Sequence, residues 1–168
     1  MKFLGHPMHQ MLIVFPLGLF ATAVIFDLIY RLGGSPTMAI VSYWMIAAGI
    51  IGGLIAAPFG WIDWFGIPQG TRAKAIGLWH GAGNVVVMLL FMASWFVRLD
   101  LPEQPDAVAL VLSFMGAGLA LLTGWLGGEL VNRLGIGVDS GAHPNAPSSL
   151  SGRPVRQFEY GMPKTKLF

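Results

Sequence analysis

The chain has 168 residues, of which 55% are hydrophobic and only 11% are charged, and its formal net charge is +2. Water-soluble domains usually contain about 25% charged residues, so this composition is typical of a protein whose surface faces lipid. The small net charge does not indicate a nucleic-acid partner. The absence of cysteine excludes disulfides, thiolate metal sites and covalent c-type haem attachment.

Four long apolar segments follow one another along the chain, over residues 11–30, 38–62, 75–97 and 107–131. A helix of about 20 residues crosses a hydrocarbon core of roughly 30 Å. The first segment is too long for a signal peptide, and a Gly-Gly-Ser-Pro turn and a second apolar run follow it at once, which predicts a retained helix. The short connections predict antiparallel neighbours. We therefore predict an all-α, up-down-up-down bundle of four transmembrane helices over residues 1–133.

Lysine and arginine are distributed unequally between the two ends of this bundle. The end that holds the N-terminus carries eight of them, and the other end carries Arg31 and Arg98. Segments rich in Lys and Arg stay on the cytoplasmic side, so we predict a protein of the bacterial inner membrane with bound lipid and both termini in the cytoplasm. Aromatic belts at the two interfaces are predicted from four tryptophans: Trp61, Trp64, Trp79 and Trp95.

Small residues are expected to bring the helices together, because glycine lets helix backbones approach closely in lipid. Three pairs have the required four-residue spacing: Gly49/Gly53, Gly77/Gly81 and Gly124/Gly128. Pro16 and Pro58 lie inside spans and are expected to kink them. Asp27 and Arg31 lie four residues apart in the first span, a spacing that predicts a local ion pair.

Polar side chains gather at the cytoplasmic end of the predicted bundle. His6 and His9 are expected to open the first helix on one face, and His80 lies near the start of the third span. The first and third helices of such a bundle are commonly diagonal, so His9 and His80 are expected to face each other. The rest of this predicted polar cluster comprises His6, Asp63, Asn84 and Glu129.

Two interpretations of these polar side chains remain open. Imidazoles from two helices can bind a b-type haem, and a nearby carboxylate can orient them; a quinone is the other cofactor considered. Alternatively, the side chains form a structural network of hydrogen bonds. The sequence contains no nucleophile–base arrangement and no phosphate-binding loop, which predicts a protein without catalytic activity.

Three sequence motifs resemble the bacterial membrane family catalogued as domain of unknown function 2231. They are His6-Pro7-Met8-His9 leading into Phe15-Pro16-Leu17-Gly18-Leu19, then Leu78 to Asn84, then Gly124 to Val131. The resemblance covers residues 4–138, and it implies a fold but no activity. Fusions of some members to Rieske-type or cytochrome modules imply an association with electron transfer. His6, His80 and Glu129 match recurrent polar positions of the family, whereas Val14 stands where many members carry histidine before the Phe-Pro pair.

Residues 134–168 differ in character from the spans, because they are rich in Gly, Pro and Ser and lack helical periodicity. We predict an extended cytoplasmic tail that docks on a partner subunit or on lipid headgroups. The candidate contact residues are basic or aromatic: Arg153, Arg156, Phe158, Tyr160 and Phe168.

The preferred hypothesis is a non-catalytic integral membrane subunit of a larger bioenergetic complex, either electron-transferring or photosynthetic, with other membrane proteins as partners. The alternative is a redox module in which His9 and His80 bind haem b or a quinone. A small transporter ranks last, because few polar side chains lie within the middle of the spans.

Overall fold

The computed structural model describes residues 2–153, so Arg156, Phe158, Tyr160 and Phe168 of the predicted docking tail lie outside the described residues. A two-stranded antiparallel hairpin, β1 (Lys2–Phe3) and β2 (His6–Pro7), precedes the helices. The helices are α1 (Met8–Leu12), α2 (Val14–Gly33), α3 (Pro36–Phe65), α4 (Arg72–Val97) and α5 (Ala107–Asn132), and a 3-10 turn, η1 (Ser149–Ser151), lies near the end of the described chain.

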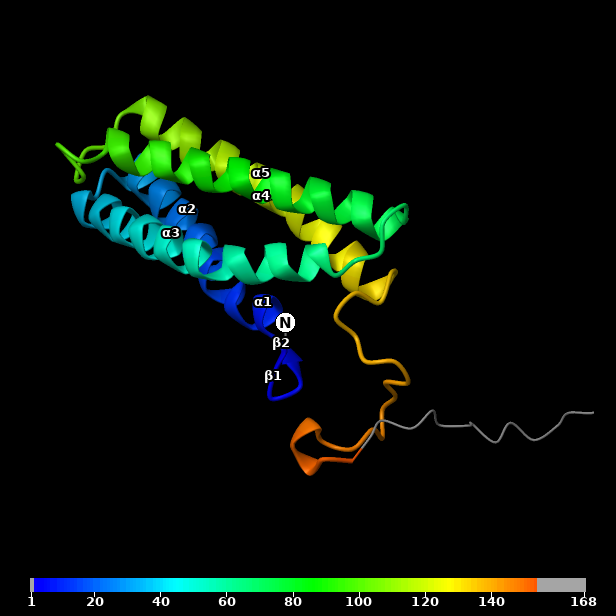
Figure 1. Cartoon of the computed structure of the whole chain (residues 1–168). Helices are drawn as coiled ribbons and strands as arrows, with labels where there is room; N and C mark the ends of the chain where they lie inside the picture. Colours follow the sequence, from blue (N-terminus) through cyan, green and yellow to red (C-terminus); the bar gives the residue numbers. More distant parts are fainter. Residues whose placement is uncertain (1, 154–168) are drawn as a thin grey trace, which may run out of the picture.

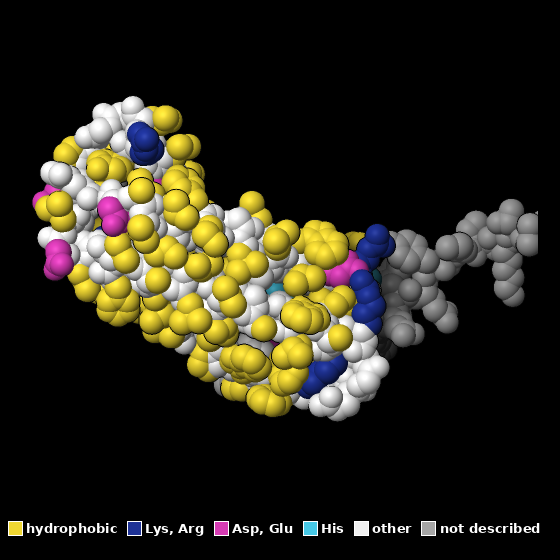
Figure 2. Space-filling model, turned by 90° about the horizontal axis from the view of Figure 1, so that it is seen from above, with side chains coloured by type: hydrophobic (Ala, Val, Ile, Leu, Met, Phe, Trp, Pro, Cys, Tyr) yellow, Lys and Arg dark blue, Asp and Glu magenta, His cyan; other side chains and the backbone are white. Residues whose placement is uncertain are grey.

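Four helical stretches are long and apolar enough to cross a membrane, as the hydrophobic pattern predicts. They are Met8–Gly33, Pro36–Phe65, Arg72–Val97 and Ala107–Asn132. Figure 2 shows hydrophobic side chains over much of the length of the bundle, whereas charged side chains gather at its two ends. An apolar surface of this extent is unfavourable in water and is stabilised against lipid. The prediction of an all-α membrane fold is therefore confirmed.

Local sequence explains where the helices begin and end. α2 ends at Gly34, whose left-handed φ of 69° is accessible to glycine without strain, and Pro36 occupies the first turn of α3. Thr71 and Asp106 cap α4 and α5 by accepting hydrogen bonds from the backbone N–H groups three residues later. α1 and α2 are separated at Ile13, three residues before Pro16. Proline has no backbone N–H, so Pro16 cannot donate a hydrogen bond to the preceding turn of the helix.

The helices form two hairpins that pack against each other. α2 lies along α3, and α4 lies along α5 (Figure 1). The α2–α3 and α4–α5 connections lie at one end of the bundle, and the N-terminus and the α3–α4 connection lie at the other (Figure 1). α2 and α4 therefore run in the same direction. A core of Phe20, Ala23, Ile46, Val87 and Phe91 joins the two hairpins.

Close helix packing is confirmed at three of the predicted glycines. A Cβ atom added at Gly49 would lie 2.5 Å from Phe20 Cε1, and one added at Gly53 would lie 2.5 Å from Met88 Sδ. A Cβ atom added at Gly77 would lie 2.7 Å from Trp64 Cδ1 of the preceding helix. These contacts leave no room for a larger residue, so glycine sets the distance between helices here.

The same expectation is wrong for Gly81 and for the pair on α5. Among residues 2–153, a Cβ atom added at Gly81 or Gly124 would meet nothing within 4 Å, and one at Gly128 would meet only Asn132 of the same helix. The four-residue spacing identifies a thin helix face but not the direction in which that face points.

The chain that follows α5 returns to the N-terminal hairpin. Lys2 of β1 forms an ion pair with Asp139, and Gln10 donates to the backbone carbonyl of Ile136 at 3.5 Å. His6 Nε2 lies 3.4 Å from Ser149 Oγ. Both ends of the described chain therefore contact each other outside the apolar bundle (Figure 1).

Candidate functional site

One polar centre, here called the histidine cluster, consists of His9, His80, Asn84 and Thr123. His80 Nδ1 lies 2.8 Å from the carbonyl oxygen of Thr123, which can only accept, so this nitrogen carries the proton. The unprotonated Nε2 accepts from Asn84 Nδ2 at 3.2 Å, and Asn84 Oδ1 accepts from Thr123 Oγ1 at 2.9 Å. These three residues form a closed ring of neutral hydrogen bonds between α4 and α5.

His9 faces His80 across the bundle. Their ring centroids are 6.3 Å apart, and the ring planes are inclined by 86°. His9 Nδ1 donates to the backbone carbonyl of Ala56 at 3.2 Å. Each imidazole also lies over a glycine, because a Cβ atom at Gly60 would be 2.9 Å from His9 Cε1 and one at Gly127 would be 3.0 Å from His80 Cε1. The structure therefore brings together the two histidines that the predicted topology had placed on facing helices.

Two other members of the predicted polar cluster, His6 and Glu129, have their described contacts outside the histidine cluster. His6 is exposed on β2 and does not share a helix face with His9, because the turn at Leu4 and Gly5 folds residues 2–7 into a hairpin. Glu129 forms a 2.6 Å ion pair with Arg72, which links α5 to α4. Asp63 lies in the last turn of α3. Of the predicted set, Asn84 hydrogen-bonds His80 within the cluster.

A second polar centre, here called the ion-pair cluster, lies at the opposite end of the bundle and was not predicted. Arg98 Nη1 and Nη2 donate to Asp27 Oδ1 and Oδ2 at 2.7 and 2.8 Å, and both side chains are 0% exposed. Ser113 Oγ donates to Asp27 Oδ2 at 2.7 Å, and Arg98 also contacts Ser42 Oγ and the carbonyl of Ala109, each at 3.3 Å. All four membrane-spanning helices thus contribute to one buried, charge-assisted network.

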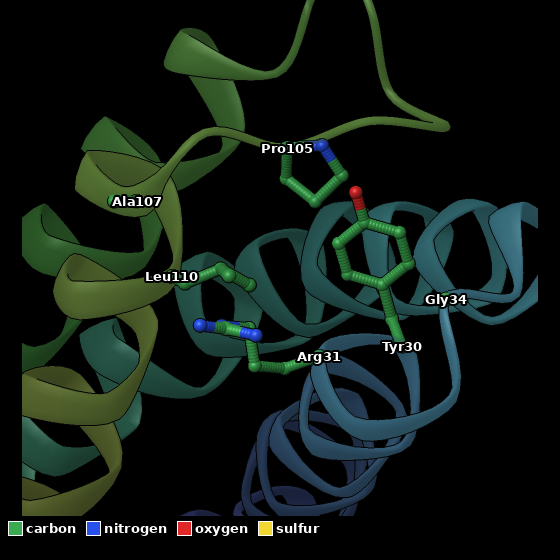
Figure 3. Close-up of a pocket in the computed structure, with 6 residues that line it drawn as sticks. All are labelled: Tyr30, Arg31, Gly34, Pro105, Ala107 and Leu110. Atoms are coloured by element: carbon green, nitrogen blue, oxygen red, sulfur yellow. The ribbon is translucent and has the colours of Figure 1, made fainter.

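The expected local pair between Asp27 and Arg31 is wrong. Both carboxylate oxygens of Asp27 are bound by Arg98, whereas Arg31 lines an open surface pocket of about 380 Å³ together with Tyr30 and Leu110. In Figure 3 the Arg31 side chain extends towards Leu110 of α5. Arg31 competes poorly for this carboxylate, because Arg98 makes a bidentate contact with it inside the protein, where the carboxylate is shielded from water.

Trp64, one of the tryptophans predicted for the interfacial belt, is partly buried and binds Lys74 at the start of α4. Its Nε1 donates to the carbonyl of Lys74 at 3.0 Å, and Lys74 Nζ donates back to the carbonyl of Trp64 at 2.8 Å. The ammonium group also lies 3.9 Å from the centre of a Trp64 ring, which is a cation–π contact. Trp95 likewise turns inwards and stacks on Tyr43, whereas Trp61 and Trp79 keep exposed faces, as expected of interfacial tryptophans.

Residues 5–140 match a family described as predicted membrane protein (DUF2231). The chain belongs to this family. The match includes all four spans, the histidine cluster and the ion-pair cluster. No curated protein and no solved structure matches the chain.

Val14, which stands where many members of the family carry histidine, does not belong to the histidine cluster. The Val14 side chain is 58% exposed on the outside of α2. A histidine at this position would therefore lie outside the ring formed by His80, Asn84 and Thr123.

Removing one hydroxyl from the histidine cluster should lower stability modestly. Thr123→Val removes the donor to Asn84 Oδ1 and keeps the side-chain volume. Interhelical hydrogen bonds in membranes contribute about 0.6 kcal/mol on average and up to about 1.7 kcal/mol. We expect a loss in this range in detergent-monitored unfolding. The matched control is Thr22→Val, because Thr22 bonds only the Gly18 carbonyl of its own helix in the described contacts; an equal loss in both variants would contradict the interhelical role.

Proposed function

We propose that this chain is a non-catalytic integral membrane subunit of a larger bioenergetic complex, electron-transferring or photosynthetic. The observation that carries the proposal is the outward-facing pair of glycines on α5. Gly124 and Gly128 have the four-residue spacing at which a second transmembrane helix approaches closely, yet no other described helix of this chain approaches either of them. A helix of a partner subunit would fill this thin face.

The internal polar groups support a structural role for the bundle. Asp27 and Arg98 bind each other, and His80, Asn84 and Thr123 bind one another, so most of their hydrogen-bonding capacity is used within the chain. A catalytic centre requires groups that are available to a substrate. Internal hydrogen bonding of this kind is what a scaffold subunit needs in lipid, where unpaired polar groups are costly.

Purification from native membranes tests the proposal. The tagged chain is extracted in mild detergent, and its partners are identified by mass spectrometry and by the absorption of any pigment or redox centre. We expect a partner that carries such a centre and that is lost from a Gly124→Ile/Gly128→Ile variant. The control is Ala48→Ile, which places a bulky side chain at an exposed position of another helix, α3. A chain that purifies alone, or a partner that both variants retain, contradicts the proposal.

The predicted docking tail is tested separately by ending the chain after Arg153. This truncation removes Arg156, Phe158, Tyr160 and Phe168 and retains the contacts of Asp139 and Ser149 with the N-terminal hairpin. We expect weaker retention of the partner at high salt, because basic and aromatic side chains would be lost from the interface. Unchanged retention would show that the tail is not a docking segment.

A second candidate function, a redox module that binds haem b or a quinone, is favoured by the geometry of His9 and His80. Both imidazoles donate Nδ1–H to a backbone carbonyl, so Nε2 carries the lone pair on each ring. This arrangement is common in metal-binding histidines. Their 6.3 Å centroid separation is close to that of two imidazoles that bind one metal ion from opposite sides with bonds of about 2.0 Å.

The fit is incomplete on one side, because His80 Nε2 already accepts a hydrogen bond from Asn84. A haem iron would have to displace this amide, and a quinol hydroxyl would have to compete with it. A reduced-minus-oxidised spectrum of the purified chain tests whether it binds haem. A haem band that both His9→Ala and His80→Ala abolish would support the redox module, and a colourless wild-type chain removes its haem version.

We propose that the histidine end lies in the cytoplasm of a bacterial cell and the ion-pair end outside. Arg98 is buried in its ion pair, so Arg31 is the exposed cation at the latter end among residues 2–153. The α4–α5 connection at this end also carries two acidic residues, Asp100 and Glu103. The exposed excess of Lys and Arg is then at the histidine end.

Labelling of single cysteines tests this orientation, because the natural chain contains none. We expect a membrane-impermeant maleimide to label Gln104→Cys in spheroplasts and Ser140→Cys only after lysis. The reverse pattern would place the termini outside.

A further inference from the structure

The two helical hairpins repeat the same internal contacts. His9 binds the Ala56 carbonyl and lies over Gly60, four residues later; His80 binds the Thr123 carbonyl and lies over Gly127, again four residues later. In the apolar middle, Phe20 lies against Gly49 and Phe91 lies against Gly116. The first helix of each hairpin thus contacts the second through the same residue types in the same order.

These counterparts have a constant spacing in the sequence. Along the first span of each hairpin, Met8–Gly33 (α1 and α2) and Arg72–Val97 with its C-cap Arg98, the separation is 71 residues, for His9/His80, Phe20/Phe91 and Asp27/Arg98. On the second helix it is 67 residues, for Gly49/Gly116, Ala56/Thr123 and Gly60/Gly127. Both hairpins also run in the same direction through the bundle (Figure 1). The arrangement is that of parallel repeats related by an axis along the membrane normal.

Three residues of the first hairpin touch their own counterparts. The imidazoles of His9 and His80 face each other at 6.3 Å, and the rings of Phe20 and Phe91 stack at 4.0 Å with a 3° angle between their planes. Asp27 forms its ion pair with Arg98. In a two-fold interface, a residue that contacts its own equivalent lies on the axis. These three contacts therefore mark an axis that runs along the bundle.

We infer that the chain is an intramolecular dimer of two helical hairpins and that Asp27 and Arg98 make each hairpin bind the other rather than a second copy of itself. Two of the three contacts on the axis join identical residues, His9 with His80 and Phe20 with Phe91. These contacts would form equally well if two copies of the same hairpin paired. At the third contact, two copies of the first hairpin would oppose Asp27 to Asp27, and two copies of the second would oppose Arg98 to Arg98. Buried like charges repel strongly, and a buried polar pair is well suited to specify partner choice.

Exchange of the two charges in the full chain tests this inference. Asp27→Arg and Arg98→Asp each place like charges on the axis, and we expect either change alone to abolish the cooperative thermal transition in detergent. The double variant D27R/R98D restores an opposite pair at equivalent positions. We expect it to regain at least half of the lost thermal stability. A double variant as unstable as the single ones would overturn the equivalence of the two positions.

A neutral pair of variants keeps the test decisive if the charge reversals do not fold. D27N/R98Q and D27Q/R98N place the same two amides on the axis in opposite order. Two-fold equivalence predicts a cooperative thermal transition for both, and a pair of amides that folds in only one of the two orders would overturn it.

Selection of the partner hairpin is tested by producing two differently tagged full chains, D27R and R98D, in one cell. The first hairpin of the D27R chain then carries a positive charge on the axis, and the second hairpin of the R98D chain carries a negative one, so these two hairpins can pair. We expect the two variants to purify together, whereas two differently tagged wild-type chains should not. Absence of the mixed complex would overturn the selective role of the two charges.

Discussion

Arg98→Met should lower the free energy of unfolding by about 3–5 kcal/mol, the usual range when one partner of a buried ion pair is removed. Asp27 is 0% exposed and receives both Nη1 and Nη2 of Arg98. In the variant its charge would keep only the Ser113 hydroxyl among the described side-chain donors. The carboxylate would then be buried in an apolar bundle without a counter-charge, and thermal or denaturant unfolding in micelles measures the loss.

Two further variants separate the charge effect from the loss of packing. Asp27→Leu/Arg98→Met removes both charges, and such replacements are often neutral or stabilising, so we expect it to be more stable than Arg98→Met. Arg31→Met changes an exposed arginine at the same end, and we expect a shift within about 0.5 kcal/mol. A double variant less stable than Arg98→Met would contradict the account of the ion pair.

Gly49→Ala should destabilise the bundle by about 1–3 kcal/mol, as overpacking of a close-packed core generally does. The new methyl group would lie 2.5 Å from Cε1 and 2.7 Å from Cδ1 of Phe20. That ring cannot move away freely, because it stacks on Phe91. The measurement is the unfolding midpoint in micelles.

Gly18→Ala on the neighbouring helix is the matched control, because a Cβ atom there meets nothing within 4 Å. Alanine also favours the helix over glycine, so this variant should be as stable as the natural chain or slightly more stable. Phe20→Leu should relieve part of the loss caused by Gly49→Ala. If Gly18→Ala is as damaging as Gly49→Ala, the contact with Phe20 is not the cause.

The four spans could be predicted from hydropathy because the bilayer imposes the same requirement on every crossing segment. The predicted span 107–131 agrees with α5 (Ala107–Asn132) to within one residue at each end. The predicted span 38–62 lies within α3 (Pro36–Phe65), which is two residues longer at its start and three residues longer at its end. The N-terminal ends of α3 and α4 begin a few residues before the apolar runs, because Pro36 is favoured in the first turn of a helix and Thr71 caps α4.

The histidine pair was within reach of sequence reasoning, whereas the ion pair was not. His9 and His80 lie near the same ends of helices whose order was predictable. Asp27 had a plausible partner four residues away, and Arg98 stood just beyond a span, where arginine usually turns towards the interface. Two available signals were a carboxylate within an apolar span and the shared 71-residue spacing of Asp27/Arg98 and His9/His80.

Hydropathy and the order of the residues were enough to predict that this protein lies in lipid, how many times it crosses, where each crossing begins and ends, and at which end of the bundle His9 and His80 lie. Tertiary structure decided which polar groups meet: Asp27 with Arg98, His80 with Asn84 and Thr123, Lys74 with Trp64. The physical reason is that hydropathy depends on each residue alone, whereas pairing depends on how closely and at what rotation two helices approach. Contacts such as Gly49 on Phe20 set that approach, and hydropathy does not record them.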